Sequence, residues 1–192
     1  MNQLTIGSLF SGYGGLDLAV TKLFDAKVIW HIEYDKAPSQ ILKHHYPETP
    51  NYGDITKVDF TQIPRVNILT GGFPCQDLSV AGNRAGLKDG TRSGLWSYFA
   101  HAIKIMQPEW IIIENVKGIL SAPATDSNME YCPECMGNHG TQPLLRALPA
   151  VLSDLATLGY NAQWQNLQAA QIGAPHRRER IFILAYPNSG QH

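Results

Sequence analysis

The sequence predicts an α/β fold in which crossover helices connect the strands of a parallel sheet. Short apolar runs rich in β-branched and aromatic residues alternate along the chain with longer amphipathic stretches, which is typical of this fold class. A length of 192 residues suits one domain, and a hydrophobic fraction of 44% is ample for a substantial core. We therefore expect a single domain over residues 1–192.

The individual elements follow from these runs, taken in chain order. The expected strands are LTIGSLF (4–10), KVIWHIE (27–33), VNILTGG (66–72), EWIIIENV (109–116), YNAQWQNL (160–167) and RIFILAY (180–186). Helical apolar spacing predicts helices at 16–24, 37–46, 93–106 and 143–159. A further short strand is expected to end near Asp54. The segment at about 121–141, rich in Pro, Asn, Gly and Cys, is interpreted as an inserted loop.

Composition narrows the setting of the protein. Three cysteines in so large a chain, with no signal segment at the N-terminus, indicate a reducing compartment, and we expect a cytoplasmic protein. The apolar runs are of strand length, so no membrane segment is expected. The formal net charge of -1 does not favour a chain that binds nucleic acid strongly by itself.

The first predicted strand leads directly into the glycine-rich segment Phe10–Gly15 and then into a helix. Glycines allow a sharp turn, and the free N–H groups of a helix N-terminus favour an anionic group. The spacing differs from the G-x-G-x-x-G dinucleotide fingerprint, so a carboxylate is expected rather than a pyrophosphate. Glu33 is placed to bind ribose hydroxyls, and Asp54 to bind an adenine amino group. S-adenosyl-L-methionine fits all three features; alternatively, the glycines only turn the chain and the acids are solvated.

Cys75 lies in the segment GGFPCQDLSVAG (71–82), directly after another predicted strand. An isolated cysteine is most often a small buried residue. Here, however, proline stiffens the approach, glycines open the backbone, and the segment shares the rim of the sheet with the first loop. A thiolate is a strong nucleophile where a nearby cation populates it. Candidates for that cation are His176, Arg177, Arg178 and Arg180.

A carboxyl group is expected on the same rim, because the strand at 109–116 ends in Glu114-Asn115-Val116. A glutamate that follows three isoleucines should be partly desolvated, which favours its protonated form and suits it to donate a proton. The alternative is a helix-capping or salt-bridged acid.

Six segments of this chain, in order, are FSGYGG, IEYDK, GDIT, GGFPCQ, ENV and PHRRERIFILA. Together they resemble the catalytic half of the DNA cytosine-5 methyltransferases, and the similarity runs from about Thr5 to Tyr186. The resemblance implies a Rossmann-like, S-adenosylmethionine-dependent methyltransferase fold, mostly parallel with one antiparallel strand near the edge of the sheet. The runs at 160–167 and 180–186 would then be a hairpin-like pair of last strands.

The resemblance also implies roles for the reacting residues. Cys75 would attack C6 of a cytosine, so that C5 can accept a methyl group. Glu114 would hold or protonate N3 of the base, Arg178 would contact O2, and Arg180 would be a structural or electrostatic partner.

For the cofactor, the resemblance places Phe10 against adenine and Glu33 on the ribose. Gly12 and Gly14 would line the methionine end, and Asp54 with Ile55 would hold the adenine. The complete set of implied cofactor residues is Phe10, Gly12, Gly14, Gly15, Glu33, Tyr34, Asp54, Ile55 and Pro74.

Such chemistry requires the cytosine to be swung out of the DNA duplex. The glycine-rich, basic segment at 80–94 could then close over the base as a lid, or else be a solvated surface loop. Asn115 is expected to position the segment Pro74–Cys75 rather than to react. The candidates on the substrate side are Gln76, Ser79, Arg84, Lys88, Arg92 and Asn115.

Only six residues follow Tyr186, whereas the family continues into a target-recognition domain. We therefore expect a second polypeptide as a source of target recognition. The resemblance also implies double-stranded DNA as the partner, in a restriction-modification, phage or epigenetic context. Two alternatives stay open, a methyltransferase acting on transfer RNA and an inactive cofactor-binding subunit or remnant.

A second cysteine motif lies in the predicted insert. Cys132 and Cys135 have the spacing of metal ligands, and His139 offers a third donor. The motif predicts either a zinc site, completed by Asp126 or a distant histidine, or free thiols in a loop.

Overall fold

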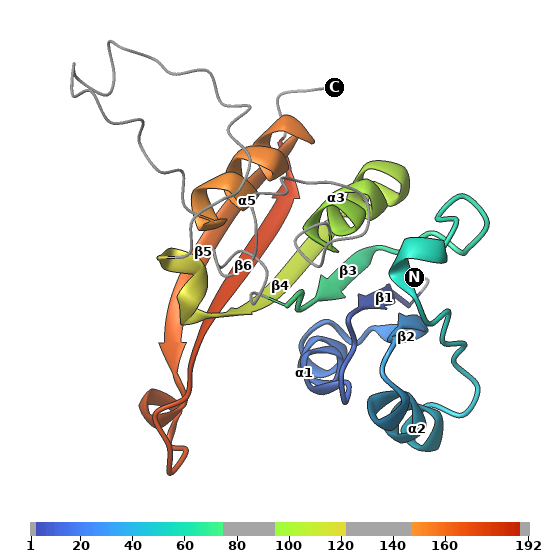
Figure 1. Cartoon of the computed structure of the whole chain (residues 1–192), viewed down its shortest axis with the longest axis horizontal. Coiled ribbons are helices and arrows are strands. Elements are labelled where there is room, and N and C mark those ends of the chain that lie inside the picture. Colours follow the sequence, from blue (N-terminus) through green and yellow to red (C-terminus); the bar gives the residue numbers. More distant parts are fainter. Residues whose placement is uncertain (1–2, 75–94, 122–146, 189–192) are drawn as a thin grey trace, which may run out of the picture.

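A six-stranded sheet forms the centre of this computed structural model, which describes residues 3–74, 95–121 and 147–188 (Figure 1). The strands are β1 (Thr5–Leu9), β2 (Lys27–Ile32), β3 (Ile68–Gly71), β4 (Trp110–Val116), β5 (Tyr160–Gln168) and β6 (Glu179–Pro187). Their order in the sheet is β2-β1-β3-β4-β6-β5. Strands β1 to β4 are parallel, and β6 runs antiparallel to both β4 and β5. The predicted mostly parallel sheet with one antiparallel strand near its edge is confirmed.

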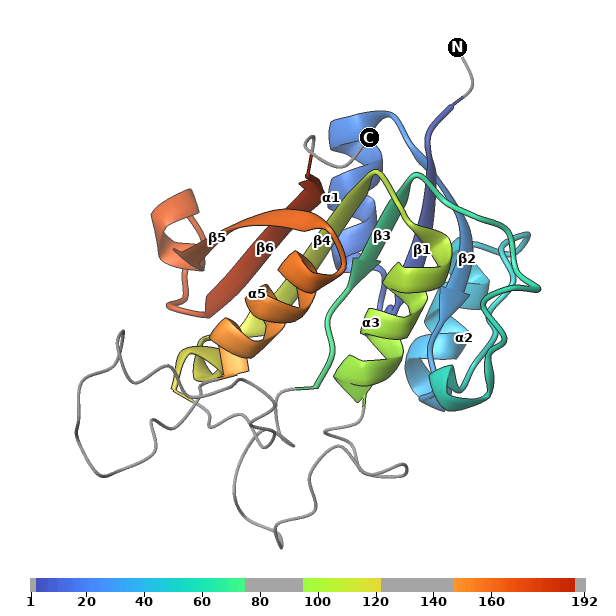
Figure 2. The ribbon, with the colours of Figure 1, turned by 90° about the horizontal axis from the view of Figure 1, so that it is seen from above.

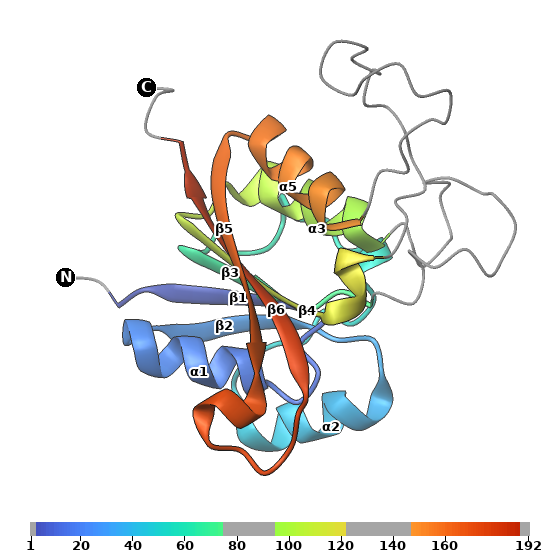
Figure 3. The ribbon, with the colours of Figure 1, turned by 90° about the vertical axis from the view of Figure 1, so that its left-hand side faces the viewer.

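Helices cover both faces of this sheet. The α-helices are α1 (Gly15–Phe24), α2 (Lys36–His45), α3 (Leu95–Met106) and α5 (Ala147–Thr157). Seen along the sheet, α1 and α2 lie on one face and α3 and α5 on the other (Figure 3). Figure 2 looks onto the face that α3 and α5 cover. Within the described residues, no helix is both long and apolar enough to cross a membrane.

The predicted short strand before Asp54 is wrong. Asn51 makes only an isolated parallel bridge with His31, and the chain then enters the 3-10 helix η1 (Ile55–Lys57). The reason is local, because the Asp54 side chain accepts hydrogen bonds from the backbone N–H and the hydroxyl of Thr56. Aspartate competes for the backbone in this way and favours turns and helix starts over strands. Apart from Ser121, the predicted insert at 121–141 lies outside the described residues.

Two apolar clusters hold the layers together. The larger cluster lies between the sheet and α3 with α5, and includes Trp30, Phe99 and Ile113. The smaller cluster includes Val20 of α1, Ile6 and Ile68. Full burial of one such side chain is worth about 1.5–3 kcal/mol, so these clusters stabilise the packing of the helices against the sheet. The remaining short helices are η3 (Lys117–Leu120) and η4 (Ala169–Ile172).

Candidate functional site

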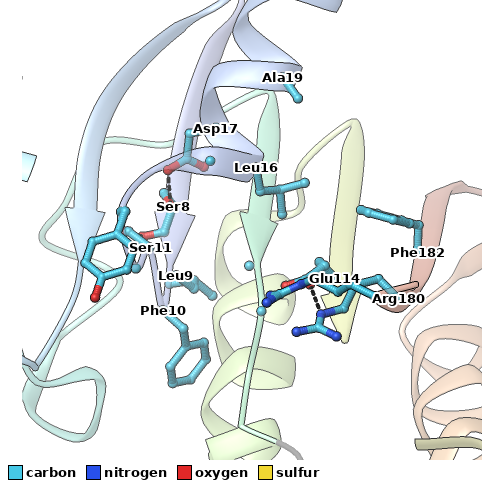
Figure 4. Close-up of a pocket in the computed structure, with 16 residues that line it drawn as sticks. Ser8, Leu9, Phe10, Ser11, Leu16, Asp17, Ala19, Glu114, Arg180 and Phe182 are labelled. Atoms are coloured by element: carbon cyan, nitrogen blue, oxygen red, sulfur yellow. Dashed lines mark hydrogen bonds and ion pairs between the residues drawn. The ribbon is translucent and has the colours of Figure 1, made fainter. Parts of the chain in front are cut away.

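Two hollows lie at the carboxyl ends of the parallel strands, where open α/β sheets bind their ligands. The first, called the Glu114 hollow, has a volume of about 500 Å³ and lies between the start of α1, the end of β4 and β6 (Figure 4). The second, called the Glu33 hollow, has a volume of about 720 Å³ and lies between the end of β2, η1 and α3. Phe10 and Gly72 line both hollows, so the two meet at the ends of β1 and β3.

The loop between β1 and α1 forms the wall that the two hollows share. Phe10 adopts a left-handed backbone conformation with φ of 51°, which is unusual for a residue other than glycine, and its ring stacks on Phe99. Gly14, with φ of 78°, is the N-cap of α1, and no side chain caps that helix N-terminus. Gly12 and Gly15 line the Glu114 hollow. The free N–H groups of α1 therefore begin beside this hollow.

Glu33 ties this loop to the end of β2. Its Oε2 accepts a hydrogen bond of 2.8 Å from the backbone N–H of Gly12, and its Oε1 accepts one of 2.8 Å from Asp35. The backbone N–H of Glu33 donates to Asn51. A ribose-binding carboxylate was predicted here, and its contact with the glycine loop is a feature that the sequence pattern did not indicate.

The remaining cofactor candidates line the Glu33 hollow from three sides. Asp54 lies within it at the N-cap of η1, where hydrogen bonds from Thr56, followed by the charge of Lys57, lower the pKa of the Asp54 carboxyl. Ile55 is buried, whereas Tyr34 is exposed. The lining residues among these candidates are Tyr34, Asp54, Ile55 and Pro74.

Sequence reasoning missed several residues of this hollow, among them two residues of α3. Leu95 and Tyr98, both in the first turn of α3, line it together with Glu33. They belong to a predicted helix, but helical spacing alone does not say which face meets a ligand. The Glu114 hollow likewise includes Leu16 of α1 and Phe182 of β6, which no motif singled out.

Glu114 and Arg180 form an ion pair in the Glu114 hollow (Figure 4). Arg180 Nε lies 2.6 Å from Glu114 Oε1, and the two side chains are 22% and 31% exposed respectively. Arg180 is also held by a hydrogen bond from its Nη1 to the carbonyl of Glu179. Of the readings that the sequence left open for Glu114, a salt-bridged acid is therefore observed, and it faces a hollow.

Gly72 allows this carboxylate to approach the end of β3. A Cβ atom at Gly72 would lie 3.2 Å from both the carbonyl oxygen and Oε2 of Glu114, closer than most such contacts. A side chain at this position would displace the backbone or the carboxylate. The glycine therefore serves close packing against the site.

The basic segment before β6 contributes only part of its charge to the hollow. Arg178 is exposed and lines the Glu114 hollow beside Arg180. His176 and Arg177 are exposed as well, and among the described residues they line neither hollow.

Asn115 connects the end of β4 to the segment that leads to Cys75. Its buried side chain donates a hydrogen bond of 3.0 Å to the carbonyl of Phe73 and accepts one of 2.8 Å from the N–H of Val116. The backbone one residue before Pro74 is thereby fixed, and Pro74 lies at the Glu33 hollow.

Several predicted site residues lie outside the described residues, and their roles stay predictions. They are Cys75, Gln76, Ser79, Arg84, Lys88, Arg92, Cys132, Cys135 and His139. Among the residues that the structure describes, no group of three or more His, Cys, Asp or Glu side chains could hold a metal ion. The zinc site therefore has no support from this part of the chain.

The sequence of this chain is similar to those of known methyltransferases. The chain is 36% identical to the Type II methyltransferase M.NgoBV of Neisseria gonorrhoeae over 188 residues, which cover 95% of this chain and 41% of the relative. It is 33% identical to the Type II methyltransferase M.BsuFI of Bacillus subtilis, covering 96% and 39% of the two chains. This chain thus spans about two fifths of the length of these curated relatives.

Solved structures show the same fold. The S. pombe Dnmt2 methyltransferase matches with a TM-score of 0.74 at 20% identity, over 99% of this chain and 53% of that one. The Spodoptera frugiperda DNMT2 mutant matches with a TM-score of 0.73, also at 20% identity, over 98% and 51%. A family model described as C-5 cytosine-specific DNA methylase matches residues 4–192. The chain therefore belongs to the C-5 cytosine-specific DNA methylase family.

Proposed function

We propose that this chain is the catalytic part of an enzyme that transfers a methyl group from S-adenosylmethionine to C5 of cytosine in DNA. The observation that carries the proposal is the meeting of two hollows at Phe10 and Gly72. One is lined by acidic and aromatic side chains, and the other holds the Glu114–Arg180 pair. A donor and an acceptor bound in adjoining hollows could thus face each other.

The Glu33 hollow fits the nucleoside part of S-adenosylmethionine. Carboxylates accept hydrogen bonds from ribose hydroxyls and from an adenine amino group, and Glu33 and Asp54 offer such acceptors on one wall. Phe10 and Tyr98 provide apolar and aromatic surface for the base. When bound, S-adenosylmethionine supplies a methyl group made electrophilic by its sulfonium. Its carboxylate would lie near the free N–H groups of α1.

The Glu114 hollow fits the cytosine ring. The Cys75 thiolate would form a bond to C6 while N3 receives a proton from Glu114, which leaves C5 nucleophilic toward the methyl group. Loss of the C5 proton to a base, cleavage of the C6–S bond and return of the N3 proton to Glu114 would then release neutral 5-methylcytosine and the thiolate. Arg178 would contact the base O2, and Arg180 would hold Glu114 in place.

DNA is the substrate that the relatives support. Two of them are named Type II methyltransferases, and the matched family is described as DNA methylase. We infer that the target base is flipped out of the duplex and that Arg84, Lys88 and Arg92 meet backbone phosphates. Target recognition would come from a further polypeptide segment or a second chain.

Transfer of a labelled methyl group tests this function. We expect label to pass from S-adenosylmethionine to duplex DNA, and enzymatic digestion of the DNA should yield labelled 5-methylcytosine. DNA in which every cytosine already carries a C5 methyl group is the matched control and should accept no label. Label found on adenine, or on the exocyclic nitrogen of cytosine, would contradict the proposed reaction.

A further inference from the structure

A row of buried polar side chains lies beneath α1, next to the Glu114 hollow. Ser8 of β1 pairs in register with His31 of β2 on one side and with Thr70 of β3 on the other. Asp17, in the first turn of α1, reaches this row (Figure 4). None of the four residues is more than 1% exposed. Buried polar groups in such number are costly unless each is paired with a hydrogen-bond or charge partner.

The Asp17 carboxylate receives two short hydrogen bonds. The Ser8 hydroxyl donates to Oδ2 at 2.7 Å, and the Thr70 hydroxyl donates to Oδ1 at 2.6 Å. His31 Nδ1 lies 3.8 Å from Oδ2, beyond hydrogen-bond distance. Neutral donors therefore satisfy both oxygens, but they do not neutralise a negative charge.

The state of His31 follows from its neighbour Ser11. The Ser11 hydroxyl donates its proton to the carbonyl of Ser8, so it acts as the acceptor toward His31 Nδ1 at 3.3 Å. Nδ1 then carries the ring proton, and the buried Nε2, which has no partner, is unprotonated. Burial lowers the pKa of His31 to about 4, which agrees with a neutral ring.

Asp17 is therefore a buried acid without a cationic partner. Among the described residues, no lysine or arginine forms an ion pair with it. Burial is the main cause that raises the pKa of Asp17, against the two hydroxyl hydrogen bonds. The pKa of nearby Tyr46 is also raised, first by burial and then by the charge of Asp17. Asp17 is nevertheless one of the residues that line the Glu114 hollow. A cation arriving in that hollow would complete the pairing that the protein leaves open.

We propose that Asp17 is a positioning residue whose negative charge favours the cationic sulfonium end of S-adenosylmethionine over its neutral product, S-adenosylhomocysteine. This inference rests on the proposed function, because it assumes that the methionine end enters the Glu114 hollow. The product lacks the transferred methyl group and the sulfonium charge, but it keeps all the other groups. A carboxylate several ångströms away would then help to expel product after each methyl transfer.

Calorimetric titration of both ligands into Asp17→Asn tests the proposal. Asparagine keeps the size of the side chain and can still bond the two hydroxyls, but it removes the charge. We expect the Kd of S-adenosylmethionine to rise about tenfold and that of S-adenosylhomocysteine to rise less than about threefold. A tenfold change is the size expected for the loss of one attraction between opposite charges that solvent partly screens. The matched control is Ser8→Ala, which removes one hydrogen bond, keeps the carboxylate and should leave the ratio of the two Kd values unchanged.

A second measurement on the unmodified protein covers the case in which Asp17→Asn does not fold. Protonation of Asp17 removes the same charge, and burial raises the pKa of this carboxyl, so the preference for S-adenosylmethionine should shrink as the pH is lowered through the range in which Asp17 takes up its proton. The groups facing Asp17 are Ser8, Thr70, His31 and Tyr46, from β1, β3, β2 and the end of α2. Equal weakening of both ligands, or a preference independent of pH, would overturn the proposal. Failure of the unmodified protein to bind either ligand would instead count against the proposed function.

Discussion

Glu33 and Glu114 carry the same carboxylate group, but the structure gives them different partners. Glu33 accepts hydrogen bonds from two backbone N–H groups and so shapes the loop that both hollows share. Glu114 pairs with the side chain of Arg180 and keeps one oxygen directed at Gly72. The first carboxylate is therefore suited to hold a ligand, and the second to act on one.

Substitution of Glu33 by alanine should weaken S-adenosylmethionine binding by one to two powers of ten. The loss of hydrogen bonds to a charged acceptor is worth about 1.5–3 kcal/mol, and Gly12 also loses its partner. Isothermal titration calorimetry measures the affinity. Glu33→Gln keeps one acceptor oxygen for Gly12 and is expected to lose less; unchanged affinity in the alanine variant would remove Glu33 from the site.

Glu114→Gln should separate chemistry from cofactor binding. Proton transfer by a positioned carboxyl typically contributes about 10²–10⁴ in rate, and glutamine cannot supply the proton. We expect methyl transfer to fall by roughly that factor while the Kd of S-adenosylmethionine stays within about threefold. A parallel loss of cofactor affinity would show that Glu114 acts as a structural residue of the pocket.

At the scale of elements, an ion pair joins the β5–β6 hairpin to the end of β4. Lys117 of η3 lies 2.7 Å from Glu179 of β6, and Gln168 and Asn166 of β5 also donate to that carboxylate. These contacts lower the pKa of Glu179 to about 2, and the contact with Lys117 is the largest cause. The end of the hairpin next to its connecting segment, where Arg178 and Arg180 lie, is thereby tied to the segment that follows β4.

The lowered pKa of Glu179 predicts how the stability of the hairpin depends on pH. A carboxyl group with a depressed pKa stabilises the fold above its unfolded-state pKa, and that stabilisation is lost as the pH falls from about 4.5 through about 2. An NMR titration of the Glu179 side-chain carbon should show a midpoint near 2. In Lys117→Ala the midpoint should move up toward the ordinary value; the same midpoint in both proteins would refute the assigned cause.

The elements also show what the sequence could and could not predict. Strands β1 to β4 and β6 follow from runs of apolar residues, because burial in a sheet that is covered by helices demands such runs. Strand β5 is largely polar and lies at the edge of the sheet, with Tyr160 as its one buried residue. Glu114 was found because it lies near the end of the apolar run that forms β4, at the rim of the sheet, whereas Asp54 was found although the strand predicted before it is absent. Tyr98 and the Asp17 row were not found, because their roles depend on which faces of α3 and α1 meet the sheet. That relation is set by packing between distant segments.

At the scale of the whole molecule, charge limits what these 192 residues can do alone. With a formal net charge of -1, the chain has no large excess of cations for phosphate binding. We expect it to bind duplex DNA weakly and with little sequence preference, mainly through Arg84, Lys88, Arg92, Arg177 and Arg178. The logarithm of the affinity should fall with the logarithm of salt concentration by a slope of roughly two to four.

Fluorescence anisotropy at several salt concentrations measures that slope. A slope near ten would indicate a far larger phosphate-binding surface than these residues provide. Efficient methylation of one defined sequence by the 192 residues alone would contradict our inference that target recognition comes from elsewhere.

The central claim, that Cys75 forms a covalent bond to C6 of cytosine, is tested most directly with 5-fluorocytosine. Duplex DNA in which every cytosine carries fluorine at C5 includes any target sequence, and fluorine cannot leave as the proton does. With S-adenosylmethionine present, we predict a protein–DNA adduct that survives denaturing electrophoresis and is absent in Cys75→Ser. Equal trapping by the serine variant, or no adduct from unmodified protein that binds both DNA and cofactor, would contradict the claim.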